Sequence, residues 1–112
     1  MANVLVVDDS STMREIVSGY LGKHGFDVAL AADGRDGLAQ LRADPDIKLV
    51  LSDINMPNMD GLAMAEKIRK ELGNTAVHII MLTTEDNPLM RDRGRAIGVT
   101  GWICLLYTSP SP

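Results

Sequence analysis

Short apolar runs that alternate with helical periodicity constrain the fold of this chain more than any other feature of its sequence. Val4–Val7 is a continuous apolar run, as expected for a strand that is covered on both faces. The next apolar residues recur at i, i+3, i+4, i+7 and i+8, which predicts one face of a helix. They are Met13, Ile16, Val17, Tyr20 and Leu21. The chain therefore begins with a predicted strand and a predicted helix.

The same alternation continues along the chain. Further strands are predicted at residues 27–31, 49–51, 78–82 and from 100 to 103, and further helices at 35–42, at about 62–72 and after residue 88. Ser10 or Ser11 can cap the first helix, and Asn87-Pro88 has the form of a cap followed by a first-turn proline. Five strands separated by four helices predict an α/β domain with a doubly wound parallel sheet. Right-handed crossovers then bring the ends of all the strands to one edge.

Composition excludes several classes of function. The 112 residues suffice for one domain. A net charge of −4, from 15 acidic and 11 basic residues, gives no footprint for direct nucleic-acid binding. The one cysteine is Cys104, so residues 1–103 can form no disulfide, which suits a reducing compartment. The start of the chain lacks a basic leader, and no apolar run is long enough to span a membrane. We therefore expect a cytoplasmic protein without membrane insertion.

Polar residues gather where the predicted strands stop. Asp8 and Asp9 follow the first strand, Asp53 follows the third, and Thr83 and Thr84 follow the fourth. In an open α/β sheet this edge forms the ligand crevice. Three carboxylates placed together repel one another without a cation, and hard oxygen ligands of this kind suit Mg²⁺. Such an ion would neutralise charge on a transferred phosphoryl group, to which a threonine hydroxyl could donate a hydrogen bond.

Each of these residues also has an ordinary structural interpretation. Asp9 or Ser10 could simply cap the following helix, and Asp53 could be a turn residue before a loop rich in proline and glycine. The threonines could be strand and cap residues. The joint placement at the ends of different strands favours a functional site. His24 and His78 lie apart from this group and are not candidate catalysts.

Three segments at these strand ends carry a family resemblance. VLVVDDSSTMREIV, LVLSDINMPNMDG and IIMLTTED resemble the receiver domain of bacterial two-component response regulators. They are most similar to the single-domain chemotaxis regulators that act on the flagellar motor switch. The resemblance spans residues 1–103 and implies a flavodoxin-like sheet with the strand order 2-1-3-4-5, which is the family's order and not one that periodicity gives.

The resemblance implies a role for each matching residue. Asp53 would be the phosphoacceptor, which takes a phosphoryl group from the phosphohistidine of a sensor histidine kinase. Asp9 and Asp53 would hold Mg²⁺, with Asp8 acting through a bound water and Asn55 through its backbone carbonyl. Thr83 would move toward the phosphoryl group after transfer. The domain would therefore be mainly a signalling switch, with self-dephosphorylation as its only other chemistry.

Other positions match the family's regulatory residues. Trp102 stands where the family usually has an aromatic switch residue, commonly tyrosine. Asn55 and Glu85 lie two positions beyond Asp53 and Thr83, where the family tunes the lifetime of its acyl phosphate, and this pair favours a short-lived signal. The resemblance also implies a monomer that binds a chemotaxis-type histidine kinase and a flagellar motor switch protein.

The end of the chain departs from the family pattern. Leu105 and Leu106 stand where a Lys-Pro pair and then a final helix are expected. No residue from 104 to 112 is charged, and Ser-Pro-Ser-Pro cannot continue a helix or a central strand. The string CLLYTSPSP resembles the in-frame translation of a transposase adapter used to prepare sequencing libraries. We interpret residues 1–103 as a receiver domain truncated in or after its fifth strand, and 104–112 as a non-native tail; a divergent receiver is the alternative.

Two expectations follow from the absence of a last helix. One face of the sheet beside the first helix should lie partly uncovered as an apolar patch, with low solubility or a low melting temperature as the result. Without its lysine, the chain should also switch poorly even if Asp53 is phosphorylated.

Other functions remain open from the sequence. The chain could be the receiver of a longer regulator whose DNA-binding or enzymatic output domain is lost. A small flavodoxin-like enzyme or nucleotide-binding domain is less well supported, because neither G-x-G-x-x-G nor G-x-x-x-x-G-K-[ST] follows the first strand. A magnesium-dependent flavodoxin-like phosphohydrolase shares an aspartate nucleophile but would need more chain for a substrate cap.

Overall fold

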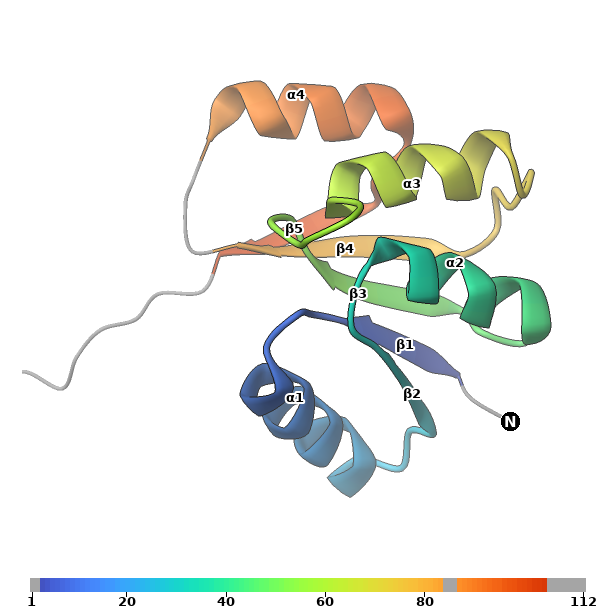
Figure 1. The fold of residues 1–112 in the computed structure, drawn as a ribbon, viewed down its shortest axis with the longest axis vertical. Helices are drawn as coiled ribbons and strands as arrows, with labels where there is room; N and C mark the ends of the chain where they lie inside the picture. Colours follow the sequence, from blue (N-terminus) through green and yellow to red (C-terminus); the bar gives the residue numbers. More distant parts are fainter. Residues whose placement is uncertain (1–2, 84–86, 105–112) are drawn as a thin grey trace, which may run out of the picture.

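The domain is a five-stranded parallel sheet with helices on both faces (Figure 1). The computed structural model describes residues 3–83 and 87–104. The sheet has the order β2-β1-β3-β4-β5, and every neighbouring pair is parallel. The elements in chain order are β1 (Val4–Val7), α1 (Ser11–Lys23), β2 (Val28–Ala31), α2 (Gly34–Ala43), β3 (Leu49–Asp53), α3 (Gly61–Lys70), β4 (His78–Thr83), α4 (Pro88–Ile97) and β5 (Gly101–Cys104). The α/β class predicted from the sequence pattern and the strand order implied by the family resemblance are both confirmed.

Register places the ends of the central strands at one edge. Val7 of β1 pairs with Ser52 of β3, so Asp8 and Asp53, the residues that follow each of these, emerge side by side. Asp53 in turn pairs with Leu82 of β4. All four residues of β1 are buried, because β1 is flanked by strands on both sides and by helices on both faces.

Side-chain caps fix where the helices begin. Ser10 caps α1 by accepting from the Met13 N–H, so Ser10 rather than Ser11 serves as the predicted cap. Asn87 caps α4 in front of Pro88, as its Asn-Pro sequence predicts. Helix α3 ends at Lys70, before the predicted residue 72, because the Leu72 N–H donates to the Lys67 carbonyl, five residues back, and leaves the i to i−4 pattern.

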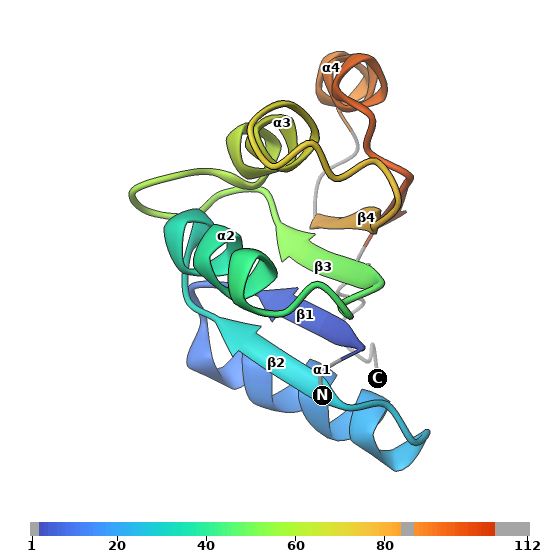
Figure 2. The ribbon, with the colours of Figure 1, turned by 90° about the vertical axis from the view of Figure 1, so that its right-hand side faces the viewer.

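The two faces of the sheet are covered unequally. Helix α1 lies on one face, and α2, α3 and α4 lie on the other (Figures 1 and 2). The larger core lies under the three helices and includes Leu62, Met64 and Ile68 of α3. The smaller core beneath α1 contains four buried residues from β1, β3 and β4. Within the described ranges, no helix combines the length and apolar character that crossing a membrane needs.

An apolar groove of about 400 Å³ runs beside α1. Its lining is Met13, Ile16, Val17, Tyr20, Leu21, Leu51, Leu82 and Ile103. The predicted apolar face of α1 therefore points at the sheet, yet α1 has no buried residue, and Ile16 and Tyr20 remain 59% and 64% exposed. The groove lies where the sequence predicts an uncovered apolar face, since α1 is the only helix on this side among the described residues.

Candidate functional site

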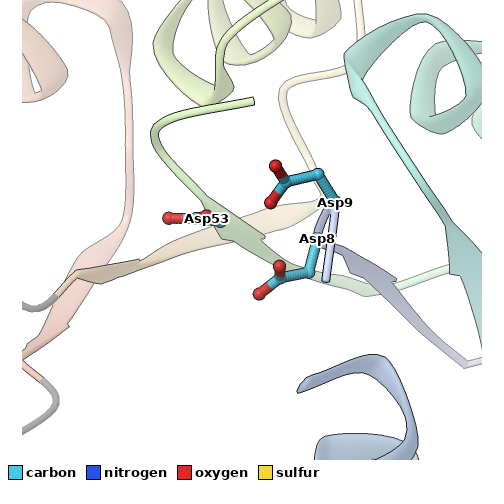
Figure 3. A group of neighbouring side chains, drawn as sticks. All are labelled: Asp8, Asp9 and Asp53. Atoms are coloured by element: carbon cyan, nitrogen blue, oxygen red, sulfur yellow. The ribbon is translucent and has the colours of Figure 1, made fainter. Parts of the chain in front are cut away.

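Three aspartates from two neighbouring strand ends meet at the carboxyl edge of the sheet (Figure 3). Asp8 and Asp9 directly follow β1, and Asp53 is the last residue of β3. One carboxylate oxygen from each lies within 4.8 Å of the others. The three differ in exposure, since Asp8 is buried, Asp53 half-buried and Asp9 exposed. The sequence predicts this cluster, and the structure brings it together.

The Asp8 side chain is held beneath the start of α1. Its Oδ1 accepts a hydrogen bond from the Ser10 N–H at 2.9 Å, and its backbone carbonyl accepts from Arg14 Nη1 at 2.6 Å. Burial raises the pKa of the Asp8 carboxyl above its ordinary value, the nearby charge of Asp9 adds to the rise, and the Ser10 hydrogen bond opposes it. The charged form of Asp8 is thus disfavoured in the folded chain.

The Asp53 carboxylate is oriented by its own neighbours. Its Oδ1 accepts from the Ile54 N–H at 2.8 Å, and the Ser52 hydroxyl donates to the Asp53 backbone carbonyl at 2.7 Å. Burial raises the pKa of the Asp53 carboxyl, and the charges of Asp8 and then Asp9 raise it further. Asp53 therefore faces the same unfavourable crowding as Asp8.

Gly61 is a structural residue of the site that the sequence argument missed. It opens α3, and a Cβ atom added there would collide with the backbone carbonyl of Asp53. Its N–H also donates to the Ile54 carbonyl at 2.8 Å, which ties the loop back to the end of β3. The only signal in the sequence is the Asp60-Gly61 pair at the end of the loop, which fits many turns equally well.

The donor set fits a small divalent cation. Three hard carboxylate oxygens stand close together, two of the groups have raised pKa values, and none of the ion pairs among the described residues includes them. A bound cation relieves this repulsion, and Mg²⁺ prefers such oxygen ligands.

The other predicted site residues lie around the cluster or farther away. Thr83 ends β4, one residue past the strand partner of Asp53, and Asn55 is exposed in the loop after β3. Trp102 lies in β5, paired with Met81 of β4. Thr84, Glu85 and Leu105 fall outside the described residues. The roles given to Thr83, Asn55 and Trp102 stay predictions.

Comparisons with known proteins agree with this geometry. The sequence matches the response regulator receiver domain family over residues 4–104. It is 37% identical to chemotaxis protein CheY1 of Helicobacter pylori over 106 residues, which is 94% of this chain and 86% of that protein. It is 38% identical to the chemotaxis protein CheY homolog of Campylobacter jejuni, covering 94% of this chain and 82% of that protein.

Solved structures show the same likeness. Chemotaxis protein CheY4 of Vibrio cholerae superposes with a TM-score of 0.88 at 39% identity, over 96% of this chain and 89% of that one. A probable two-component system response regulator/GGDEF domain protein superposes with a TM-score of 0.83 at 31% identity, over 94% of this chain but only 43% of that one.

Proposed function

The chain belongs to the response regulator receiver family, and we propose that Asp53 is the phosphoacceptor of its phosphorylation-dependent switch. The meeting of Asp8, Asp9 and Asp53 within 4.8 Å at the ends of β1 and β3 is the observation that supports this assignment best. Of the three, Asp53 has a carboxylate that is both half-buried and oriented by a backbone N–H, which suits a nucleophile that must be held in line.

The proposed reaction is a phosphoryl transfer from a phosphohistidine. An Asp53 carboxylate oxygen attacks the phosphorus, a P–O bond forms, the P–N bond breaks, and the histidine leaves with its electron pair. Water later attacks the phosphorus of the acyl phosphate, which releases inorganic phosphate and restores the carboxylate. Asn55 and Glu85 are proposed to set the rate of this second step.

Asp9 and Asp53 would hold Mg²⁺, with Asp8 acting through water and Asn55 through its backbone carbonyl. When bound, the ion supplies charge neutralisation for the phosphoryl oxygens. The Thr83 hydroxyl, at the end of the neighbouring strand, would donate to a phosphoryl oxygen. Trp102 would report the phosphorylated state to a partner through its position in β5.

We place the switch in chemotaxis. The relatives from Helicobacter and Campylobacter are named as chemotaxis proteins, and this chain spans most of their length. The proposed partners are a chemotaxis-type sensor histidine kinase and a flagellar motor switch protein, and the chain is proposed to act as a cytoplasmic monomer.

A receiver within a longer regulator is the second candidate. The match to a response regulator/GGDEF domain protein, of which this chain covers 43%, supports it. Sequencing the source gene downstream of codon 103 separates the two, because a stop codon soon after one further helix favours the stand-alone regulator.

The same genomic sequence tests the proposed non-native origin of residues 104–112. Codons for CLLYTSPSP in the genome would exclude that origin. Cys104 itself is the last residue of β5.

Labelling with a small-molecule phosphodonor tests the acceptor assignment. Wild type incubated with labelled acetyl phosphate and Mg²⁺ should take up label, and Asp53→Asn should not. Removing Mg²⁺ with a chelator should abolish the uptake. Equal labelling of wild type and Asp53→Asn would exclude Asp53 as the acceptor.

A further inference from the structure

Trp102 points to the face of the sheet that carries α4. It pairs with the buried Met81 and packs against the larger core, whereas its neighbour Ile103 lines the groove on the α1 face. Helix α4 lies on the same face as α2 and α3 (Figure 1). The indole is half-buried, so the contact with α4 decides how much of the ring is shielded from water.

The indole lies against α4 at Gly94. A Cβ atom built on Gly94 would lie 2.6 Å from Cζ2 and 3.4 Å from Cε2 of Trp102. The first distance is shorter than carbon atoms tolerate, so the ring occupies the space that any other residue's side chain would fill. Gly94 is also the only buried residue of α4.

The backbone gives no separate reason for a glycine at this position. Gly94 lies within α4 and is not among the glycines with positive φ, which are Gly25, Gly73 and Gly98. In the interior of a helix, alanine is the better residue. The contact with the indole, and not the conformation of the helix backbone, therefore accounts for a glycine at position 94.

The turn after α4 is pinned, so α4 cannot easily withdraw from the ring. Arg69 of α3 donates from Nε and Nη2 to the Gly98 carbonyl at 3.1 and 2.9 Å, and from Nη1 to the Asn74 carbonyl at 2.9 Å. Thr100 is held to Ile79 of β4 by two hydrogen bonds, of 2.8 and 3.0 Å. An added side chain at Gly94 must therefore displace the indole.

We infer that Gly94 is a positioning residue: its lack of a side chain seats the Trp102 indole against α4 and so determines where the proposed switch aromatic rests. The inference depends on the proposed function only for the switch role of Trp102. The packing can be measured in the unphosphorylated chain, so its test is separate from the labelling of Asp53.

Fluorescence of the single tryptophan measures the indole directly. Gly94→Ala should shift the Trp102 emission to longer wavelength and raise the acrylamide quenching constant of the folded protein, because the ring moves toward water. Gly19→Ala is the matched control, since Gly19 lies within α1 with nothing within 4 Å of an added Cβ. Unchanged emission and quenching in Gly94→Ala would overturn the inference.

A double-mutant cycle followed by melting temperature distinguishes loss of the Gly94–Trp102 contact from a general destabilisation of α4. Gly94→Ala should lower the melting temperature in the wild-type background. In a Trp102→Phe background, whose single ring lacks Cζ2, the same change should be neutral or stabilising, as helix propensity predicts. An equal loss in both backgrounds would show that Gly94 acts on α4 alone and would contradict the inference.

Discussion

At the scale of single residues, the folded site disfavours the charged carboxylates of two of its three aspartates. Asp8 and Asp53 have raised pKa values, chiefly because they are buried and then because neighbouring aspartates crowd them. The sequence predicts this group because each aspartate ends a predicted strand of a parallel sheet, where strand ends converge. Gly61 and Gly94 could not be predicted in this way, since each depends on contact with a residue that is not adjacent in the chain.

The raised pKa values predict how stability depends on pH. The ordinary pKa of an aspartate carboxyl, 3.8, applies to Asp53 in the unfolded chain, and folding raises it. The folded chain therefore binds the Asp53 proton more tightly than the unfolded chain does. The resulting stabilisation is complete below that value and is lost as pH rises through the raised pKa. In a chelator at about pH 7, Asp53→Asn should therefore melt at a higher temperature than wild type, and the difference should shrink toward pH 4.

Asp27 provides the control for that pH series. It is exposed and directly precedes β2, at the edge of the sheet opposite the aspartate cluster. Asp27→Asn should shift the melting temperature little at either pH. A metal-free Asp53→Asn protein that is less stable than wild type at neutral pH would contradict the crowding of charge at the site.

Magnesium should reverse the same repulsion. A cation that binds only the folded chain stabilises it by about 2.7 kcal/mol at a concentration 100 times its Kd. Mg²⁺ should therefore raise the melting temperature of wild type near neutral pH, and Asp9→Asn should reduce this gain because it removes one ligand. Titrations followed by thermal melting measure both. An identical response in wild type and Asp9→Asn would remove Asp9 from the metal site.

At the scale of elements, the site depends on how the loop after β3 returns to α3. Asp60 caps α3 by accepting from the Ala63 N–H at 2.7 Å, and Gly61 then passes against the Asp53 carbonyl. The sequence predicts the order and type of the nine elements found in the described part of the chain, because apolar periodicity is a local property. The ends predicted for several elements differ by one or two residues from those observed, because ends such as that of α3 depend on individual hydrogen bonds that periodicity does not specify.

Gly61→Ala tests the close approach of α3 to β3. The added Cβ should push the two segments apart and cost about 1–3 kcal/mol of the free energy of unfolding, as overpacking typically does. It should also weaken the response to Mg²⁺, because the Asp53 backbone moves. Urea denaturation measures the first effect. Gly22→Ala in α1, with open space around it, should not destabilise, and a Gly61→Ala protein as stable as that control would contradict the contact.

At the scale of the whole molecule, one face of the sheet has less cover than the other. Three helices bury the larger core, whereas among the described residues only α1 covers the opposite face, where an apolar groove lies beside it. The alternation of strands and helices predicts the sheet, but the strand order came from the family resemblance. No local pattern specifies which strands become neighbours.

Dye binding should reveal the groove. The folded chain should bind a hydrophobic dye such as ANS, and Ile16→Gln should reduce that binding with little loss of stability, because Ile16 lines the groove yet is 59% exposed. Leu89→Gln is the control: Leu89 is 79% exposed on α4, away from the groove. Equal losses of dye binding in the two variants would show that the groove is not the binding surface.

Asp53 is the residue proposed to accept the phosphoryl group, and chemical trapping can identify the acceptor. The chain is phosphorylated with a small-molecule donor and Mg²⁺, reduced with borohydride and mapped by peptide mass spectrometry. An acyl phosphate is reduced to the alcohol, so we predict homoserine at position 53 and unmodified aspartate at positions 8 and 9. Homoserine at position 8 or 9, or none at position 53 in a chain that has taken up label, would contradict the assignment of Asp53 as the acceptor.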